Sequence, residues 1–360
     1  MRCIHSPELS YGEFSKLIHQ KAISERVPIN GSIEVTARCN LSCAHCYINM
    51  PAADRVAQER ESNYLEWCHI IDQIVDEGCL WLLLTGGEPF IRPDFLDIYT
   101  YAKRKGLLIT LFTNGTLITP YIADYLAEWK PFSIEISVYG RTKETYESVT
   151  RVLGSYERCM QGIHHLLERK IPLKLKTMVM TINQHEIWDM KSWAEGLGVE
   201  FRYDPVLNSG LDGSKKPCRL RIEPEKAVEF DILDEKRFKA WKEFIGKFLG
   251  APDSDLLYHC GAGVASFHID PYGVMSLCIM SRDFSYDLHR GSFKEGWYKF
   301  IPRVRTRKRV NKSRCGECEL ISLCGQCPGW GELEHDDPET PVEYLCEIAH
   351  LRAEALGITG

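Results

Sequence analysis

The chain has 360 residues, of which 44% are hydrophobic, so it can bury a large core and is expected to form one large domain with a smaller one. Its 44 Lys and Arg residues against 50 Asp and Glu residues give a net charge of −6, which excludes a global basic field that would attract nucleic acid or anionic lipid. Since no apolar run is long enough to cross a bilayer, we expect a cytoplasmic protein with neither a membrane nor a nucleic-acid partner.

After about thirty residues without a clear pattern, short apolar runs alternate with amphipathic stretches. The apolar runs predict strands at 32–37, 80–85, 108–113, 133–138, 173–180 and 200–203. The amphipathic stretches predict helices at 63–77, 94–105, 119–129, 155–168 and 186–197. Asn63 and Ser155 stand where N-caps belong, and Gly78 and Gly106 follow the last turns of their helices.

Strands separated by helical crossovers pair in parallel, and such sheets carry their sites at the carboxyl ends of the strands. The pattern therefore predicts an α/β fold, a partial (β/α)6 barrel of the TIM type, followed by a small cysteine-rich domain. We expect four regions, namely an N-terminal segment at 1–30, the partial barrel at 31–207, a connector at 208–255 and the cysteine-rich domain at 256–360. The connector contains one predicted helix, at 224–249.

Fifteen cysteines in a reducing compartment indicate metal or cluster ligation, because disulfide frameworks belong to small secreted domains. Cys39, Cys43 and Cys46 follow the first predicted strand in a CxxxCxxC spacing. Three close thiolates can hold three corners of a four-iron cluster and leave one iron open for a cofactor or substrate. The alternative is a structural zinc site with a fourth ligand such as His45.

This loop resembles the signature of the radical S-adenosylmethionine (radical SAM) superfamily. Gly86, Gly87, Glu88 and Pro89, directly after the second predicted strand, resemble the GGEP motif of that family. The resemblance implies that the open iron of the N-terminal cluster chelates S-adenosylmethionine and that the GGEP residues contact its methionyl amine. Glycine suits this place because it lets the backbone approach a ligand closely. Without the cysteine loop, the two glycines would be an ordinary turn at a strand end.

Three further matches lie at later strand ends, at Thr113-Asn114-Gly115, Ser137 and Arg151. By resemblance, these positions contact the ribose, the adenosine side and the methionyl carboxylate of the cofactor. Arginine suits a carboxylate because its fork can bond both oxygens. Taken alone, the three matches are explained as well by an Asn-Gly turn, a buried strand serine and a solvated arginine.

Seven cysteines crowd about the last hundred residues at ordered spacings, namely Cys260, Cys278, Cys315, Cys318, Cys324, Cys327 and Cys346. This order resembles the SPASM domain, which binds auxiliary iron-sulfur clusters in radical SAM enzymes that mature peptides and proteins. The resemblance implies one cluster held by Cys315, Cys318, Cys324 and Cys346 and another held by Cys260, Cys278 and Cys327. The chain would then carry three 4Fe-4S clusters. A zinc ribbon is the alternative for residues 315–327, but it leaves three cysteines unexplained.

Two four-coordinate auxiliary clusters need eight ligands, whereas this region offers seven cysteines. One corner is therefore open, or it is filled from elsewhere. Cys218 is the unassigned cysteine of the connector. We favour the open corner, because nothing in the sequence places Cys218 at ligand spacing and an isolated loop cysteine is usually a free thiol.

The resemblance implies reductive cleavage of S-adenosylmethionine to a 5'-deoxyadenosyl radical, which abstracts a hydrogen atom from the substrate. Most look-alikes modify ribosomally made peptides by thioether or carbon-carbon cross-links, oxidation or epimerisation. Ile279 follows Cys278 where sulfatase-modifying members have an acidic residue, which argues against that subgroup. We expect a peptide substrate, presented by a separate recognition protein, and a reductant such as flavodoxin or ferredoxin. The alternatives are a small-molecule substrate and a non-catalytic iron-sulfur electron carrier.

Overall fold

The computed structural model describes residues 9–48, 50–252, 254–311 and 313–358, so residues 1–8 of the expected N-terminal segment lie outside the described residues. The strands are β1 (Asn30–Thr36), β2 (Arg38–Cys39), β3 (Met50–Pro51), β4 (Trp81–Gly86), β5 (Leu108–Thr113), β6 (Ser133–Ser137), β7 (Leu173–Met178), β8 (Glu200–Asp204), β9 (Ser266–Ile269), β10 (Val274–Ser276) and β11 (Tyr286–Asp287). The helices are α1 (Tyr11–Glu25), α2 (Arg55–Arg60), α3 (Tyr64–Asp76), α4 (Phe95–Arg104), α5 (Pro120–Glu128), α6 (Lys143–Thr150), α7 (Ser155–Glu168), α8 (Ile187–Gly196), α9 (Pro224–Leu233), α10 (Glu235–Phe248), α11 (Phe293–Glu295), α12 (Ile301–Arg305), α13 (Ile321–Cys324), α14 (Pro328–His335) and α15 (Glu343–Ala355).

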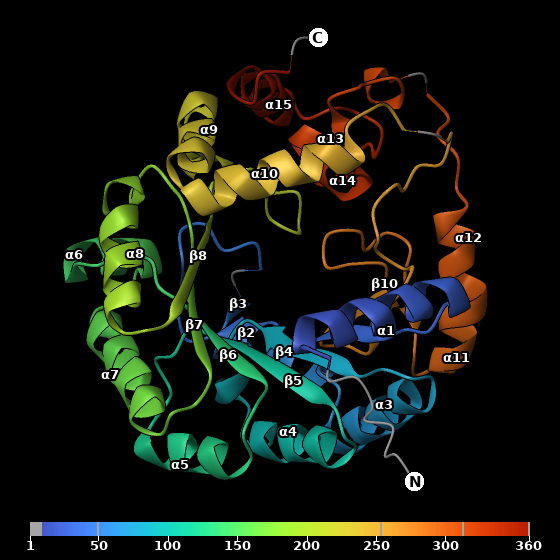
Figure 1. The fold of residues 1–360 in the computed structure, drawn as a ribbon. Coiled ribbons are helices and arrows are strands. Elements are labelled where there is room, and N and C mark those ends of the chain that lie inside the picture. Colours follow the sequence, from blue (N-terminus) through green and yellow to red (C-terminus); the bar gives the residue numbers. More distant parts are fainter. Residues whose placement is uncertain (1–8, 49, 253, 312, 359–360) are drawn as a thin grey trace, which may run out of the picture.

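One sheet organises the molecule, with the strand order β11-β10-β9-β1-β4-β5-β6-β7-β8. The six predicted strands correspond to β1 and β4 to β8, and each pairs in parallel with the next. Helices α3, α4, α5, α7 and α8 lie around the outside of these strands (Figure 1). The predicted α/β fold with a partial (β/α)6 barrel is therefore confirmed.

The two faces of the barrel strands differ in polarity, as β1 illustrates. Ile33 and Val35 are fully buried in the main hydrophobic core together with Trp67 of α3. Because side chains alternate along a strand, Glu34 and Thr36 lie on the opposite face, inside the barrel. Both are fully buried as well. The apolar face binds the helices, and the polar inner face is left for chemistry.

Helix ends follow local capping chemistry, with two corrections to the predicted helices. Asn63 caps α3 in a capping box, as predicted. The prediction that Ser155 caps α7 is wrong, because Gly154 is the N-cap, with a φ of 72°. The predicted helix at 224–249 is two helices, α9 and α10, which divide at Asp234, whose side chain accepts hydrogen bonds from the first turn of α10.

Helix α6 was not predicted, although it lies between two predicted elements. Its sequence is largely polar and only eight residues long, so its apolar periodicity is weak. Its N-terminus is fixed from a distance, by Glu186 before α8. The Glu186 carboxylate accepts hydrogen bonds from the backbone amides of Arg141 and Thr142 and from the hydroxyls of Thr142 and Thr145. A contact between elements 45 residues apart stabilises this helix.

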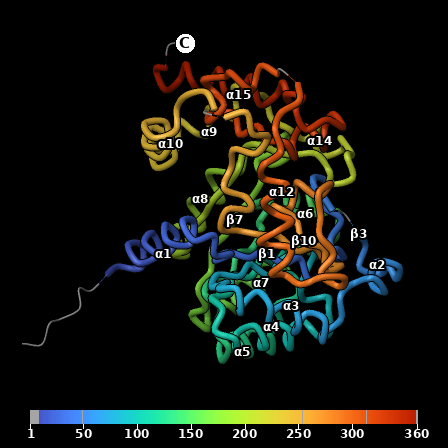
Figure 2. The backbone as a smooth tube through the Cα atoms, turned by 90° about the vertical axis from the view of Figure 1, so that its right-hand side faces the viewer, coloured from blue at the N-terminus to red at the C-terminus, as the bar shows by residue number. Residues whose placement is uncertain are grey.

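The C-terminal region joins the barrel sheet. Strand β9 pairs in parallel with β1, from Asn30 opposite Ser266 to Ile33 opposite Ile269. The chain on either side of the expected boundary at residue 256 therefore shares one sheet. Helix α9 of the connector lies beside the C-terminal helix α15 in both views (Figure 1, Figure 2), and α10 contacts α13. A buried ion pair from Arg352 of α15 to Asp231 of α9, at 2.7 Å, holds these two helices together.

Candidate functional site

The cysteine loop leaves β2 and returns at β3, and these two short strands pair in parallel. The backbone amides of Ser42 and Ala44 donate hydrogen bonds to the carbonyl groups of Thr150 and Val149, over 3.1 and 2.8 Å. Both carbonyls belong to the last turn of α6, where helical carbonyl groups lack intrahelical partners. The helix that the sequence did not predict therefore holds the cysteine loop in place.

The three cysteines of this loop line one cavity. The Cys39 Sγ accepts a hydrogen bond from the backbone amide of Leu41 at 3.4 Å, and the Asn114 Nδ2 lies 3.7 Å away. Burial raises the pKa of Cys39 to about 12 and also raises the pKa of Cys43. Thiols in such surroundings become thiolates when a metal supplies positive charge, so the donor set fits an iron-sulfur cluster.

A zinc site would require several ligand side chains around one metal ion. Among the residues that the structure describes, no three His, Cys, Asp or Glu side chains are placed to hold one metal ion. A four-iron cluster needs a wider arrangement, because each thiolate binds a different iron. His45, the alternative fourth ligand, packs edge-on against Tyr139 with 4.7 Å between ring centroids, and burial lowers its pKa to about 4.

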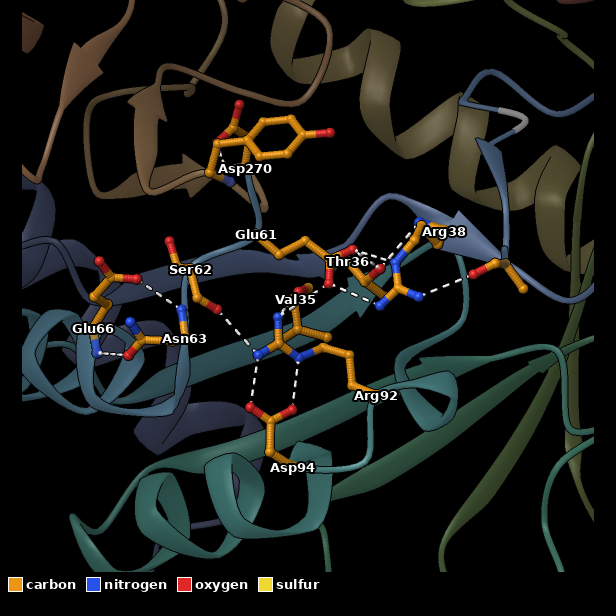
Figure 3. Close-up of polar contacts among 12 residues, drawn as sticks. Val35, Thr36, Arg38, Glu61, Ser62, Asn63, Glu66, Arg92, Asp94 and Asp270 are labelled. Atoms are coloured by element: carbon orange, nitrogen blue, oxygen red, sulfur yellow. Dashed lines mark hydrogen bonds and ion pairs between the residues drawn. The ribbon is translucent and has the colours of Figure 1, made fainter. Parts of the chain in front are cut away.

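A buried ion-pair network fixes the start of the loop (Figure 3). The Glu61 carboxylate accepts hydrogen bonds from Thr36 Oγ1 at 2.5 Å and from Arg38 at 2.9 and 3.0 Å, and it pairs with Arg92 at 3.4 Å. Arg92 also pairs with Asp94 at 2.8 Å. Arg38 is the residue before the first cysteine, so the network determines where the loop leaves the sheet. Buried carboxylates of this kind are stable only with such full pairing.

The two glycines of the GGEP motif are required by the backbone of the neighbouring strand. A Cβ on Gly86 would lie 2.1 Å from the Thr36 carbonyl oxygen, and a Cβ on Gly87 would lie 2.2 Å from the Arg38 carbonyl oxygen. The Gly87 amide donates a hydrogen bond to Thr36 over 2.8 Å. The sequence predicts that the glycines let the backbone approach a ligand closely. The structure shows that they also let it approach the backbone of Thr36 and Arg38, just before the first cysteine. Both glycines line the cavity.

Glu88 and Pro89 do not line the cavity. The Glu88 carboxylate accepts hydrogen bonds from Thr113 Oγ1 at 2.8 and 2.9 Å and from the Asn114 amide at 2.7 Å. Burial raises the pKa of Glu88 to about 7. Pro89 is buried and begins a short 3-10 helix, Pro89–Ile91. These two residues lie outside the cavity lining, and the contact with the cofactor that the resemblance implies for them stays a prediction.

Thr113, Asn114 and Ser137 line the same cavity as the cysteines. Asn114 links two strand ends, because its Nδ2 donates to Asn40 Oδ1 at 2.9 Å while its Oδ1 accepts from the Thr116 amide at 2.9 Å. The cavity measures about 580 Å³, which is in the range of small-molecule and cofactor sites. Three cysteines, two glycines and three polar side chains therefore line one cavity. The first of them, Cys39, and the last, Ser137, are 98 residues apart in sequence.

Arg151 lies in a different place. It ends α6 in the left-handed conformation, with a φ of 57°, and it lines a second cavity of about 370 Å³ together with Cys43 and Cys46. The far wall of that cavity is the segment from Gly210 to Leu220. The structure thus places Arg151 in the lining of a neighbouring cavity, whereas the glycines and Ser137 line the main one.

Sequence analysis missed the far wall of the main cavity. Lys176 of β7, Arg202 of β8 and Arg237 of α10 line it. Arg202 lies near the carboxyl end of a predicted strand, which is the position where parallel sheets carry functional groups, so strand position was an available signal for it. Lys176 lies in the middle of its predicted strand and carries no such signal. No local pattern marks Arg237, which is brought in by the connector helix.

The C-terminal cysteines form two groups. The pKa of Cys324 is raised to about 12, mainly by burial and in part by the neighbouring thiols of Cys346, Cys315 and Cys318. The structure therefore brings together the four cysteines that the resemblance assigns to one cluster. Arg314 Nη2 lies 3.4 Å from the Cys346 Sγ, close enough to compensate thiolate charge.

The second group contains Cys260, Cys278 and Cys327. Burial raises the pKa of Cys327 to about 11, with further contributions from the thiols of Cys278 and Cys260. Cys218 has other neighbours, because the charges that act on its pKa after burial are those of Arg221 and Glu334.

Comparison with known proteins agrees with this geometry. The profile of the Radical SAM superfamily matches residues 33–194. An AdoMet-dependent heme synthase of Methanosarcina barkeri (strain Fusaro / DSM 804) is 34% identical over 322 residues, which cover 82% of this chain and 89% of that protein. The chain belongs to the radical SAM superfamily. It is therefore a radical SAM enzyme, and this membership implies S-adenosylmethionine and a 4Fe-4S cluster as cofactors.

Two further relatives extend the likeness beyond the barrel. The antilisterial bacteriocin subtilosin biosynthesis protein AlbA of Bacillus subtilis (strain 168) is 26% identical over 84% of this chain and 67% of its own length. The structure of Streptococcus suis SuiB bound to the precursor peptide SuiA has a TM-score of 0.69 at 17% identity and covers 96% of this chain and 83% of that chain. The SuiB likeness shows the fold. In the described residues, no helix is long and apolar enough to cross a membrane.

Proposed function

We propose that this enzyme uses S-adenosylmethionine to remove a hydrogen atom from a substrate held at the far wall of the main cavity. The observation that carries the proposal is the common lining of one cavity by the three loop cysteines, the two glycines and the strand-end residues Thr113, Asn114 and Ser137. When bound, the cluster and S-adenosylmethionine supply a 5'-deoxyadenosyl radical.

The chain's own residues have three tasks in this proposal. Cys39, Cys43 and Cys46 would hold three irons and leave the fourth for the cofactor. The backbone edge at Gly86 and Gly87 would bind the methionyl part, and the three strand-end residues would bind the nucleoside. The buried inner face of the barrel excludes water, which protects a reactive intermediate from side reactions.

We further propose a ribosomally made peptide as the substrate, modified by a cross-link such as a thioether, by oxidation or by epimerisation. AlbA is by name a bacteriocin biosynthesis protein, and SuiB was solved with a precursor peptide. The region from residue 256 would act as a SPASM domain, whose two auxiliary clusters accept the electron left on the substrate. A separate recognition protein would present the peptide, a flavodoxin or ferredoxin would deliver electrons, and the reaction would take place in the cytoplasm.

A small molecule is the second candidate substrate. It is favoured by the identity of 34% to a heme synthase, which is higher than the 26% identity to AlbA and covers more of the relative. The cations Lys176, Arg202 and Arg237 in the cavity wall would suit a substrate with carboxylates.

The test is anaerobic reduction of the reconstituted protein with S-adenosylmethionine, followed by chromatography for 5'-deoxyadenosine and by iron quantitation. We expect 5'-deoxyadenosine and roughly 10 to 12 irons per chain if three clusters have four irons each. Stoichiometric zinc with little iron, or no 5'-deoxyadenosine, would contradict the proposal. Mass spectrometry then distinguishes the two substrate classes. A mass change in peptides encoded beside the gene indicates a peptide substrate, and a mass change in an iron porphyrin indicates a small molecule.

A further inference from the structure

The far wall of the main cavity contains two cations that share one carboxylate. Glu135 of β6 accepts a short hydrogen bond from Arg202 Nη2, and its Oε2 lies 3.7 Å from Lys176 Nζ. Lys176 and Arg202 are direct neighbours in the register of β7 and β8. The Lys176 Nζ also lies 2.7 Å from the centroid of the Phe112 ring, which lines the cavity with both cations.

The charges of this group do not balance. Lys176 and Arg202 face one carboxylate, and the Lys176 ion pair is long, so one positive charge is poorly compensated. Burial lowers the pKa of Lys176 well below its usual value and the charge of Arg202 lowers it further, so an anion bound beside Lys176 would stabilise its charged form. By contrast, Lys174, two residues earlier on the same strand, has its own partner in Glu200 at 2.8 Å and does not line the cavity.

The other charged groups of the wall do not compensate the positive charge of Lys176 and Arg202. Arg237 is paired with Asp231, at 2.5 and 3.1 Å, and donates to the Tyr203 carbonyl oxygen at 2.9 Å. Asp231 also pairs with Arg352, so it is shared between two arginines. Burial raises the pKa of Asp204, which disfavours the anionic form of the remaining acid of the wall.

We propose that Lys176 and Arg202 form a subsite that binds a carboxylate of the substrate. This inference rests on the proposed function and names the chemical class of its substrate. A carboxylate placed between the two cations would complete the pairing that Glu135 alone leaves unfinished. Its bond to Lys176, whose side chain is 19% exposed, would be stronger than its bond to Arg202, whose side chain is 53% exposed. The subsite would hold the substrate in the same cavity that the two glycines line. The carboxylate belongs either to a peptide side chain or to a small molecule.

The experiment measures binding of radiolabelled glutarate to the reconstituted holoenzyme with S-adenosylmethionine, by equilibrium dialysis. We expect glutarate to bind and its neutral analogue glutaramide not to bind. Lys176→Met and Arg202→Met should weaken glutarate binding roughly tenfold each, whereas Lys174→Met should bind as the wild type does. Glu135→Gln removes the competing internal carboxylate and should tighten glutarate binding by about threefold, a gain that a damaged fold cannot produce.

The inference is overturned by equal binding of glutarate and glutaramide, by undiminished binding in Lys176→Met, or by weaker binding in Glu135→Gln. Dialysis needs no turnover, so a wild type that cleaves S-adenosylmethionine without binding glutarate sinks this inference alone. A wild type that makes no 5'-deoxyadenosine sinks the proposed function while the dialysis remains readable. Tighter binding of N-acetylglutamate N-methylamide than of glutarate indicates a peptide carboxylate, and the reverse order indicates a small molecule.

Discussion

Cys39, Cys43 and Cys46 come from one loop of the barrel, while all the proposed auxiliary ligands come from residues beyond 256. Replacing the three loop cysteines by Ala should therefore abolish 5'-deoxyadenosine formation and remove about one third of the iron, since one of three proposed clusters is lost. Iron quantitation and anaerobic chromatography check both outcomes.

Cys68→Ala is the matched control for this variant, because Cys68 is a half-buried helical thiol of α3 outside every proposed ligand set. Its iron content and activity should equal those of the wild type. A triple variant that still forms 5'-deoxyadenosine would show that the catalytic cluster is held elsewhere.

Gly87 lines the cofactor cavity and also packs against the backbone just before Cys39. In Gly87→Ala, the new methyl group would lie 2.2 Å from the Arg38 carbonyl oxygen and 2.6 Å from that of Ala37, so the start of the cysteine loop must move. We expect a loss of stability of about 1–3 kcal/mol, weaker S-adenosylmethionine binding and less iron at the N-terminal cluster. Thermal unfolding, titration and iron quantitation measure the three effects.

Gly196→Ala provides the comparison, because a Cβ at this helical glycine meets nothing within 4 Å. It should leave binding unchanged and stabilise the protein by up to about 1 kcal/mol. If Gly87→Ala weakened cofactor binding at full iron content, the glycine would serve the ligand alone and not the loop.

At the scale of elements, α6 depends on Glu186 and in turn holds the cysteine loop. Glu186→Gln weakens the four hydrogen bonds that the carboxylate accepts at the start of α6. We expect the unfolding free energy to fall by about 1–3 kcal/mol, because bonds to a charged acceptor are among the stronger ones. Chemical denaturation measures this. Asp189→Asn, on the next helix and outside this set of bonds, is the control.

The same carboxylate makes stability depend on pH. Burial raises the pKa of Glu186, but the hydrogen bonds from Thr142, Thr145 and Arg141 outweigh burial and leave the pKa below its usual 4.5. A group with a lowered pKa in the folded state contributes stability above its unfolded value, and that contribution is lost as the pH falls through the folded value. Wild type should therefore lose more stability than Glu186→Gln below about pH 4.5. Parallel loss in both proteins would contradict this role.

At the scale of the whole molecule, the barrel and the cysteine-rich region are joined by the pairing of β1 with β9. A chain that ends at residue 255 would expose the edge of β1 and the apolar residues that Phe267 and Ile269 cover. We expect such a chain to aggregate, because an open strand edge beside apolar surface is a template for association. Size-exclusion chromatography beside the full chain tests this, and a monomeric, folded truncation would show two independent domains.

The sequence by itself predicts the barrel strands and most of the helices, because these depend on local periodicity. It also gives the cysteine spacings, because the cysteines of one cluster loop lie close together along the chain. Asn63 and its capping box are a local signal of this kind. The family resemblance came from the same local motifs, such as the cysteine loop and the glycines after β4.

Tertiary structure decided what depends on contacts between distant residues. Helix α6 has weak periodicity and is stabilised by Glu186, 36 or more residues beyond its last turn. The motif predicts a cofactor contact for Glu88, and only the structure shows that its carboxylate accepts a hydrogen bond from Thr113, 25 residues further along the chain. Glu135 can interact with both Lys176 and Arg202 only because β6, β7 and β8 lie side by side in a fixed register. No spacing along the chain encodes that register.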